Sequence, residues 1–545
     1  MRPINSIQYT KSIILLFVVS FFSTIILAQT APPIQWQKTY GGTSPDYAEV
    51  VLNTPDGGYV VAGTAGSHDI DVVGNHGTNI NAQDFWIVKL DSNGNIQWKK
   101  CYGSQWSEFV YSIAQARDGG YIVTGTTGGV GGDVTKFRTN PNYTSEDIWV
   151  IKISATGTLI WEKSYGGINS ENTKKIVQVS DGGYVFMGTT YSNDDDVSGK
   201  HGPSTLPVVT GDIWVVKIDS LGTIKWQKCL GGSSGEIGWD MLLTSNDGLL
   251  VLGNAFSTDG DVNKLRDSND VWVIQLDSTG NILWNKTYGG SRNDMGYSVI
   301  KNINGGGYVI AGETWSNNGD VSTARKGESD VWVLGIDDTG KVLWDKSFGG
   351  SRFEYAARIL QTPDSGFVIG GITNSNDNDI SVSKGNNDWW ILRLDKMHNL
   401  KWEKSFGTLA SDKFNGMTLA NDGYVLVGYM ADNSGDHLNY KGKQDWIIIK
   451  LKENFKGGTT SISANGVVAD IKVYPSPTNG IVNIDLPKGY DKVQLKLYDM
   501  QGRLVKEVES EGLKRSVDLS GLSYGTYMIQ VQYQDQLESF KVLYN

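Results

Sequence analysis

A short tryptophan motif returns seven times along the chain and constrains its fold more than any other feature. Each copy reads Trp, any residue, Lys, any residue, a mostly aromatic position and Gly, and successive copies lie 58 to 65 residues apart. The tryptophans are Trp36, Trp98, Trp161, Trp226, Trp284, Trp344 and Trp402. A period of this length is typical of a stacked repeat architecture. Residues present in every repeat are therefore predicted to build the scaffold.

Each repeat contains four strand-like stretches separated by turn residues. In the first repeat they span Tyr47 to Leu52, Tyr59 to Thr64, Asp84 to Leu90 and Ile96 to Tyr102. Short β-rich runs bounded by Gly, Asn and Asp are strand signals. The third stretch is apolar on both faces, which indicates a sheet that is covered on both sides. Four-stranded sheets covered by their own neighbours are the blades of a β-propeller.

The two ends of the repeat region complement each other. The region begins with an unaccompanied fourth strand, Ile34 to Tyr40, while its last repeat, residues 408–451, has three strands instead of four. We predict that the first strand completes the last blade, because ring closure hides two sheet edges that would otherwise promote aggregation. The predicted fold is all-β, with a seven-bladed β-propeller over residues 29–456 that is closed by its N-terminal strand.

The N-terminus and the net charge indicate the compartment. Arg2 and Lys11 supply positive charge, Ile13 to Leu27 is mostly apolar, and the small Ala28 follows. This order is typical of a signal peptide, so residues 1–28 are predicted to be removed. A signal anchor is the alternative, but the apolar run is shorter than the ~20 residues that span a bilayer. No later stretch could span a membrane. The formal net charge of −11, without a dense Lys/Arg cluster, argues against a nucleic-acid partner.

The composition changes after the repeats. Residues 457–469 begin with Gly-Gly-Thr-Thr-Ser and predict a short flexible linker. Residues 470–545 alternate between strand-like stretches and turns. This pattern predicts a small Ig-like β-sandwich as a second domain.

Several motifs in this C-terminal module form a specific combination. They are Tyr-Pro-x-Pro-Thr-x-Gly, a Tyr-Asp-x-x-Gly turn, Asp-Leu-Ser-x-Leu and a late Gly-x-Tyr. The key residues are Tyr474, Pro475, Pro477, Gly480, Gly502, Gly525, Tyr527 and Lys541. The module resembles the type A C-terminal sorting domain of the type IX secretion system. The resemblance implies that the type IX translocon and a sortase-like peptidase are partners, and that the protein is secreted or displayed on the outer-membrane surface.

The repeats carry a weaker resemblance. They look like the tandem repeats common in the cargo of that secretion system. Their Leu-Asp-x-x-Gly-x-Ile-x-Trp stretch is similar to the tryptophan-docking repeat of quinoprotein-like propellers. That likeness concerns the scaffold and implies no activity.

Acidic residues recur at fixed places in every repeat. One follows the Gly-Gly, as at Asp46, and another lies in the long loop between the second and third strands, as at Asp71. If the strands run outward from the axis in order, both sets emerge on one face, where they would bind Ca²⁺ or a cationic ligand. The alternative, which sevenfold repetition favours, is that they cap turns by bonding to the backbone. The densest cluster, Asp194, Asp195 and Asp196, is the candidate metal site, and calcium is the one cofactor that we consider.

Catalysis finds little support in the sequence. The five histidines show no metal-ligand spacing and no nucleophile-elbow or zinc-protease motif occurs, so we predict no catalytic residue. Departures from the repeat are a better guide, since an active site normally breaks the repetition. The candidate ligand-binding residues are Trp106, Trp239, Trp315, Arg292 and Arg352, because Trp and Arg are enriched at binding hot spots. The alternative is that they simply pack.

The leading hypothesis is a secreted or surface-displayed propeller that binds an extracellular protein or glycan without catalysis. One rival is a hydrolase or lyase that acts on extracellular polysaccharide at the propeller mouth, and another is a purely structural envelope protein. A non-repeated cluster of carboxylates with Arg or Tyr at the axis would favour the enzyme. An aromatic or Arg patch without an acid pair would favour binding.

Overall fold

The structure is a computed structural model. It describes residues 30–78, 82–138, 145–205, 208–263, 265, 269–303, 305–420, 422–437, 439–453, 472–474, 480–485, 492–499, 504–511, 514–523, 525–533 and 536–544. The predicted signal peptide, residues 1–28, and the predicted linker, residues 457–469, lie outside the described residues. In the part of the chain that is described, the one helical element is the 3-10 turn η1 (Ser245–Asp247), so the all-β prediction is confirmed.

The repeat region forms seven four-stranded antiparallel sheets. Six of them use strands in chain order. The first and second sheets contain β2 (Asp46–Asn53), β3 (Tyr59–Ala65), β4 (Asp84–Leu90) and β5 (Ile96–Tyr102), and then β6 (Glu108–Gln115), β7 (Tyr121–Thr127), β8 (Asp147–Ile153) and β9 (Leu159–Tyr165); the third and fourth contain β10 (Glu171–Gln178), β11 (Tyr184–Thr190), β14 (Asp212–Ile218) and β15 (Ile224–Leu230), and then β16 (Glu236–Leu243), β17 (Leu249–Ala255), β18 (Asp270–Leu276) and β19 (Ile282–Tyr288). The fifth and sixth sheets contain β20 (Asp294–Lys301), β21 (Tyr308–Thr314), β22 (Asp330–Ile336) and β23 (Val342–Phe348), and then β24 (Glu354–Gln361), β25 (Phe367–Thr373), β26 (Asp388–Leu394) and β27 (Leu400–Phe406). The seventh sheet joins both ends of the region: β1 (Ile34–Tyr40), β28 (Lys413–Ala420), β29 (Gly423–Met430) and β30 (Asp445–Lys452). A small hairpin, β12 (Ser204–Thr205) and β13 (Val208–Val209), lies in one long loop.

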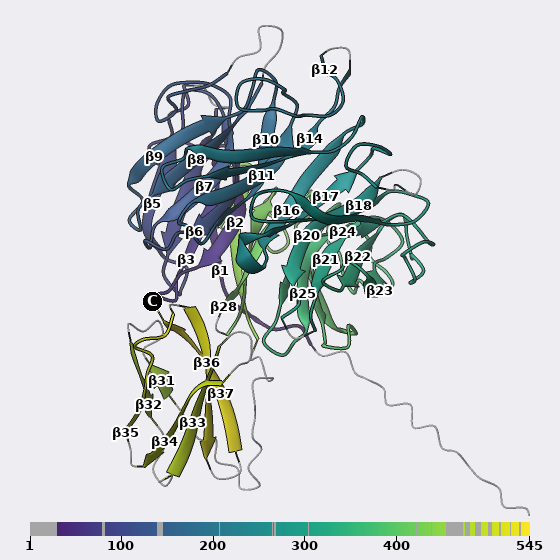
Figure 1. The fold of residues 1–545 in the computed structure, drawn as a ribbon. Coiled ribbons are helices and arrows are strands. Elements are labelled where there is room, and N and C mark those ends of the chain that lie inside the picture. Colours follow the sequence, from purple (N-terminus) through teal and green to yellow (C-terminus); the bar gives the residue numbers. More distant parts are fainter. Residues whose placement is uncertain are drawn as a thin grey trace, which may run out of the picture.

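The seven sheets surround a common axis (Figure 1). The first strand of each sheet in chain order lies innermost, except that β28 takes this place in the seventh sheet. Each inner strand contacts the inner strands of both neighbouring sheets, in the cyclic order β2, β6, β10, β16, β20, β24, β28 and back to β2. The sheets therefore close into a ring, as propeller blades do.

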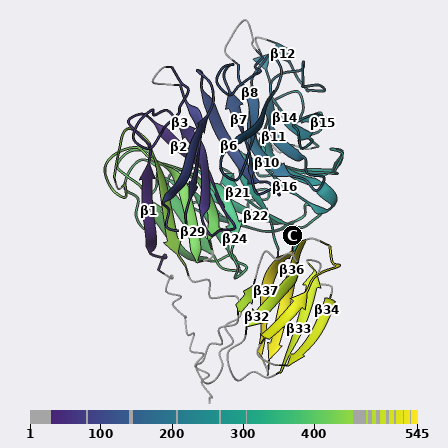
Figure 2. The ribbon, with the colours of Figure 1, turned by 90° about the vertical axis from the view of Figure 1, so that its left-hand side faces the viewer.

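The N-terminal strand closes this ring. β1 pairs antiparallel with β30, with Tyr40 opposite Trp446 and Gln37 opposite Ile449. In Figure 2 the purple β1 lies beside the green strands of the seventh sheet. The Trp446 ring packs 4.2 Å from the Trp86 ring of the first sheet, and both side chains are fully buried. This is the pairing that the complementary ends of the sequence predict.

The repeated tryptophans join neighbouring sheets. Trp36 of β1 packs 6.1 Å from the Tyr59 ring of the next sheet, and Trp98 and Trp161 make the same contact one and two sheets further on. Four of the fourth strands, β1, β5, β9 and β19, end in a tyrosine that adds a hydrogen bond to the next sheet. The Tyr102 hydroxyl, for example, donates to the Gly157 carbonyl of the next sheet at 2.5 Å. The tryptophan of the repeated motif thus fills the gap between neighbouring sheets at these contacts.

The turn between the third and fourth strands favours a glycine for two reasons, as Gly94 of the first sheet shows. Gly94 lies in the left-handed region at φ 79°, where L side chains are strained. A Cβ atom at Gly94 would also lie 3.0 Å from the Trp36 ring of the preceding sheet. In the sixth sheet His398 takes this place at φ 65° and stacks on Trp344, with ring centroids 3.6 Å apart. The turn between the third and fourth strands therefore depends on the repeated tryptophan.

The C-terminal module consists of two sheets over one core. One sheet contains β31 (Lys472–Tyr474), β32 (Ile481–Asp485) and β35 (Lys514–Asp518); the other contains β33 (Lys492–Asp499), β34 (Leu504–Glu511), β36 (Gly525–Tyr533) and β37 (Gln536–Tyr544). The buried side chains come from both sheets, among them Val482 and Ile484 of the first and Leu495 and Ile529 of the second. The module is therefore a pair of β-sheets packed face to face.

We expect deletion of residues 30–40 to open the ring. The deletion leaves the edge of β30 unpaired and uncovers Trp446, so the truncated protein should melt on the order of 10 °C lower and without a single cooperative transition. Differential scanning calorimetry of the two proteins measures this difference.

Peptide complementation supplies the control. A synthetic peptide of residues 30–42 should restore the transition, because β1 acts by pairing with β30, and a scrambled peptide should not. If the truncated protein melts like the full chain, the ring does not depend on β1.

Candidate functional site

Every inner strand carries a β-bulge at the same level. In each of the seven pairings between an inner strand and its neighbour the register shifts once, which leaves one residue of the inner strand without a partner. These residues are Glu49, Tyr111, Lys174, Trp239, Tyr297, Ala357 and Asn415. Bulges re-aim side chains and are common next to functional sites.

All seven bulged residues line one cavity of about 460 Å³. Because each residue comes from a different sheet of the ring, the cavity lies on the ring axis. We call it the axial cavity. Its volume falls in the ~300–1,000 Å³ range of small-molecule sites. The bulged residues lie in the first half of their strands, so the cavity is nearer to the face on which these strands begin.

Aromatic side chains make a run along one side of the axial cavity. The Trp239 and Tyr297 rings meet edge to face at 4.9 Å, and the Tyr355 ring lies 5.8 Å from that of Tyr297. We call these three residues the aromatic run. The ammonium of Lys174 lies 5.0 Å from the Trp239 ring and 4.4 Å from the Tyr111 ring, in cation–π geometry. The aromatic contacts thus fix the position of the lysine.

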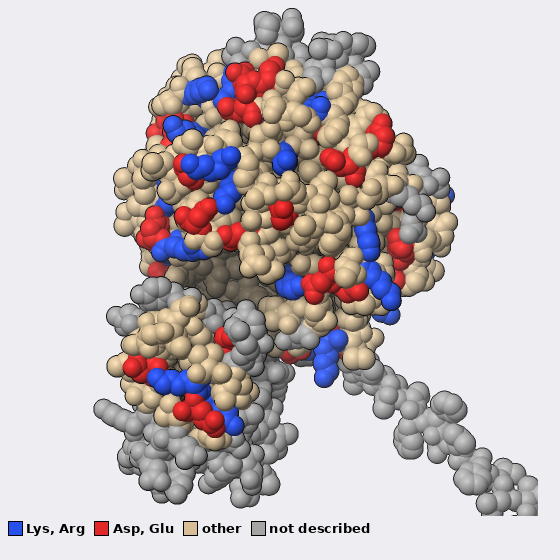
Figure 3. Space-filling view, viewed as in Figure 1, with Lys and Arg blue, Asp and Glu red and all other residues tan. Residues whose placement is uncertain are grey.

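Four charged side chains face the axial cavity: Glu49, Lys174, Arg358 and Lys413. Within the described ranges none of them has an oppositely charged atom within 4.0 Å. On the face of the molecule seen in Figure 3, by contrast, basic and acidic side chains are intermingled. The cavity therefore holds charges that the protein itself leaves without an ion pair.

Burial perturbs the titration of these charges. It is the largest cause that lowers the pKa of Lys174 to about 8, and Glu49 offsets it in part. The charges of Lys413 and Arg358 lower the pKa of Lys174 further. Burial also raises the pKa of Glu49, although the three cations oppose that shift. Perturbed groups gathered in a cavity are a mark of functional sites.

Hydrogen bonds fix some of the lining and leave one donor open. The Tyr297 hydroxyl donates to Glu313 Oε1 at 2.7 Å, and Asn415 Nδ2 donates to the Ala48 carbonyl at 2.8 Å. The second bond joins the last inner strand to the first. The indole Nε1 of Trp239 is buried, and it has no acceptor among the residues that the structure describes. The same is true of the scaffold tryptophans Trp86, Trp226, Trp389 and Trp402, so an open indole donor does not by itself mark a ligand.

The predicted ligand-binding residues fall into three places. Trp239 lies in the axial cavity. Arg292 and Trp315 line a separate surface pocket of about 260 Å³, and Trp315 packs 5.3 Å from Phe353, the neighbour of Arg352. Trp106 precedes β6, three sheets away from Arg292 and Trp315, and is half-exposed at 53%. The structure thus brings Trp315 and Arg292 together and separates them from Trp239 and Trp106.

Sequence reasoning missed most of the axial cavity, although a signal for it exists. Each bulged residue is the third after the recurring acid that starts the inner strand, as Glu49 follows Asp46 and Tyr111 follows Glu108. The acid is constant in character across the repeats, whereas the third residue after it is different in nearly every copy. A variable position at a fixed place in a repeat marks the axis of such a ring.

We call the face that carries the Gly-Gly turns and the long loops the loop face. Its recurring acids hold the backbone of the scaffold by hydrogen bonds. The acid that starts each inner strand accepts a backbone N–H four residues earlier, as Glu171 does from Gly167 at 2.9 Å. The acid of each long loop accepts the N–H of the first Gly after the fourth strand, as Asp261 does from Gly231 at 3.2 Å. The same two bonds occur in all seven repeats. Both loop sets therefore meet on one face, as expected for strands that run outward from the axis in order.

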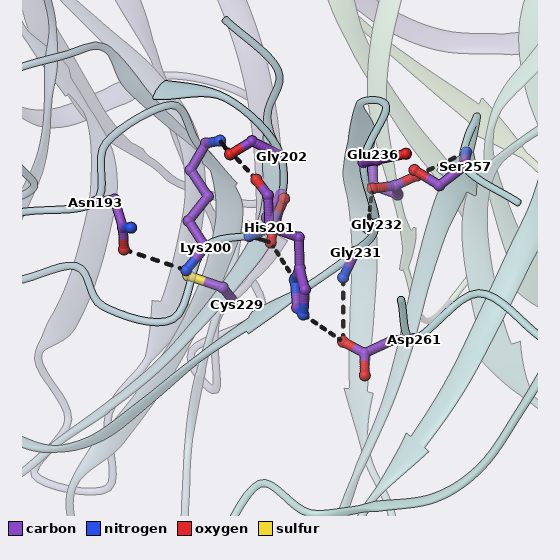
Figure 4. Close-up of polar contacts among 12 residues, drawn as sticks. Asn193, Lys200, His201, Gly202, Cys229, Gly231, Gly232, Glu236, Ser257 and Asp261 are labelled. Atoms are coloured by element: carbon purple, nitrogen blue, oxygen red, sulfur yellow. Dashed lines mark hydrogen bonds and ion pairs between the residues drawn. The ribbon is translucent and has the colours of Figure 1, made fainter. Parts of the chain in front are cut away.

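Basic side chains bridge neighbouring sheets on this face. His201 Nδ1 lies 2.8 Å from Asp212 of its own sheet, and its Nε2 lies 4.0 Å from Asp261 of the next one. Figure 4 shows the His201 ring directed toward Asp261. Arg138 likewise joins Asp147 at 2.9 Å to Asp196. Residues that bridge in this way are His76, Arg138, His201, Lys326, Lys384 and Lys441.

The candidate metal residues belong to this loop network. Asp194 accepts the Ile168 N–H at 2.9 Å, and Asp196 binds Arg138 and the Gly166 N–H. Asp195 is exposed at a turn, with φ 51°. In the described ranges no group of three His, Cys, Asp or Glu side chains is arranged to hold a metal ion. The calcium site stays a prediction.

Three of the described C-terminal motif residues lie at the ends of strands, and two lie within strands. Tyr474 ends β31, Gly480 precedes β32 and its carbonyl accepts the Leu519 N–H at 2.7 Å, and Gly525 begins β36. Tyr527 is buried, and its hydroxyl donates to the Ser523 carbonyl at 2.6 Å. Lys541 lies in β37 opposite Met528. Pro475, Pro477 and Gly502 lie outside the described residues.

Residues 472–545 match the family model of the secretion system C-terminal sorting domain. This domain marks the chain as cargo of the type IX secretion machinery, which carries it to the cell surface or the extracellular space. No helix in the described part of the chain is long and apolar enough to cross a membrane. A comparison with curated proteins finds no match.

Solved structures with a similar fold are distant. A fungal alcohol oxidase in complex with copper is 13% identical and has a TM-score of 0.43; the match covers 94% of this chain and 100% of the oxidase chain. The Neurospora crassa Pan2 WD40 domain is 9% identical, with coverages of 76% and 100% and a TM-score of 0.40. PorZ, a type IX secretion component of Porphyromonas gingivalis, is 12% identical, with coverages of 94% and 75% and a TM-score of 0.28. Nothing about the ligand of this chain follows from such distant likenesses.

Buried carboxyl groups of the loop face make the stability depend on pH. Burial is the largest cause that raises the pKa to about 6 for Asp46 and Asp412, and to about 7 for Glu108, Asp147 and Glu171. A nearby carboxylate adds to each shift. Between about pH 4 and pH 7 the folded protein therefore holds protons that the unfolded chain has released.

We expect the melting temperature to rise as the pH falls from 7.5 to 5.5, on the order of 5 °C, because the raised carboxyl pKa values favour the folded state at acid pH. Thermal denaturation across this range measures the slope. Glu171→Gln should flatten it, while the exposed Glu328→Gln should leave it unchanged. A melting temperature that falls on acidification would show that these groups are ionised in the folded protein.

Proposed function

We propose that the protein is a secreted or surface-displayed seven-bladed β-propeller that binds an extracellular protein or glycan in its axial cavity and catalyses no reaction. The observation that carries this proposal is that the repeat breaks down at one level of the ring, where equivalent positions of the seven sheets carry different residues. Seven bulged residues from seven sheets are of six different types and line a single cavity. A scaffold needs no such variation, since symmetric sheets are satisfied by equivalent side chains.

The composition of the axial cavity supports binding over hydrolysis. Its lining has one carboxylate, Glu49, beside Arg358 and several aromatic rings. Most glycoside hydrolases use two carboxyl groups, one on each side of the scissile bond. An aromatic and cationic lining without an acid pair is the arrangement expected of a binding site.

The second candidate is a polysaccharide lyase with the same site. One observation favours it: Lys174, whose pKa is lowered to about 8, lies beside Tyr111. An amine that titrates near neutral pH is suited to accept a proton. Turnover of a polysaccharide by the purified protein would decide for this candidate.

The domain plan and the partners belong to the same proposal. Residues 1–28 act as a cleaved signal peptide, residues 29–456 as the propeller, residues 457–469 as the linker and residues 470–545 as an Ig-like sorting domain. The sorting domain engages the type IX translocon and a sortase-like peptidase. Trp315 and Arg292 offer a second contact surface for a large ligand.

Binding screens of the chain without residues 1–28 test the proposal. The protein is applied to an array of extracellular glycans and to immobilised surface extracts. Trp239→Ala should weaken the retained interaction at least tenfold, because it removes the aromatic centre of the axial cavity. Phe256→Ala, outside the cavity and exposed, is the matched control and should bind like the native protein.

Melting temperatures show whether each variant is folded. Lys174→Met gives a second test of the same cavity, should Trp239→Ala lose its fold. A native protein that retains no probe, or a set of folded cavity variants that all bind normally, contradicts the proposal.

A further inference from the structure

The axial cavity carries positive charge on an acidic protein. Lys174, Arg358 and Lys413 face Glu49 across it, which gives the lining a net charge of +2, whereas the whole chain carries −11. In the described part of the chain these cations have no carboxylate within 4.0 Å. An excess of unpaired cations in a partly dry site attracts an anion more strongly than the same charges would in water.

The cations are also placed to receive an anion. Arg358 donates one N–H to the Ala357 carbonyl at 2.9 Å, and no acceptor for its other N–H groups is found among the described residues. A guanidinium has five such donors in a planar fork that matches a carboxylate or sulfate group. Lys174 is held between the Tyr111 and Trp239 rings, so less freedom is lost when it binds.

The aromatic run adds a surface for a flat apolar group. Trp239, Tyr297 and Tyr355 come from three consecutive inner strands, and Arg358 lies three residues beyond Tyr355 on the same strand. A sugar ring has a face of C–H groups and a rim of hydroxyl groups, which suits this combination of apolar rings and polar donors.

A peptide fits the axial cavity less well. One common mode of peptide recognition adds an extended peptide to a continuous strand edge through main-chain hydrogen bonds. Here every inner strand is interrupted by its bulge at the level of the cavity. A bulge disrupts the ladder locally, so no strand offers an unbroken edge at this point.

We propose that the axial cavity binds an anionic saccharide. A carboxylate or sulfate group lies against Lys174, Arg358 and Lys413, and the sugar ring packs on the aromatic run. This inference rests on the proposed binding function and adds the chemical class of the ligand.

Isothermal titration calorimetry with four probes tests the inference on the chain without residues 1–28. The probes are hexagalacturonate, a sulfated dextran oligomer, a neutral dextran oligomer of equal length and poly-glutamate. We expect hexagalacturonate or the sulfated oligomer to bind at least tenfold more tightly than the neutral oligomer, and to weaken with added salt. The first two probes distinguish a carboxylate from a sulfate ligand.

Charge variants locate the contact. Arg358→Gln and Lys413→Gln should each weaken the anionic saccharide at least tenfold. The exposed Lys443→Gln, outside the cavity lining, should leave the affinity unchanged. Lys413 is exposed, so its variant tests the charge without disturbing the core, and melting temperatures confirm the fold of each variant.

Two results overturn the inference and leave the binding function in place. The first is equal affinity for the neutral and the anionic oligomers, with both lost in Trp239→Ala. The second is tighter binding of poly-glutamate than of either anionic saccharide. If Trp239→Ala binds every probe with the affinity of the native protein, the proposed binding function itself is wrong.

Discussion

The structure depends on one pairing between segments that lie about 400 residues apart in sequence, β1 and β30. Without it the seventh sheet has three strands, and both ends of the stack expose an edge. With it, the Trp86–Trp446 core between the first and last sheets becomes equivalent to the other sheet contacts. The axial cavity exists only in the closed state, because its lining takes one bulged residue from every sheet.

The same repeat serves two purposes at two levels of the ring. On the loop face, constant acids such as Glu171 and Asp261 hold backbone N–H groups, and bridging basic side chains such as His201 join neighbouring sheets. A few residues along the inner strand, the bulge turns one side chain toward the axis. That position is free to vary, since the strand pairing does not use it. The repeated residues therefore stabilise the ring, and the proposed function assigns ligand specificity to the bulged ones.

Much of the scaffold could be predicted from the sequence. The Trp-x-Lys motif indicates the contact between sheets, and the missing fourth strand of the last repeat indicates its pairing with β1. The site was harder to predict. Trp239 stands out as an aromatic departure from the repeat, but Glu49, Lys174 and Asn415 look like ordinary surface residues. Only the bulge, which depends on the pairing of whole strands, turns them toward the axis.

The central claim is that β1 is an integral strand of a closed ring. Hydrogen–deuterium exchange, followed by mass spectrometry of the native protein, tests it directly by comparing β1 with β5, the equivalent strand of the first sheet. The account predicts that the amides of Ile34–Tyr40 exchange as slowly as those of Ile96–Tyr102, because both strands pair along their full length. Exchange of the β1 amides within seconds, while β5 stays protected, would contradict it.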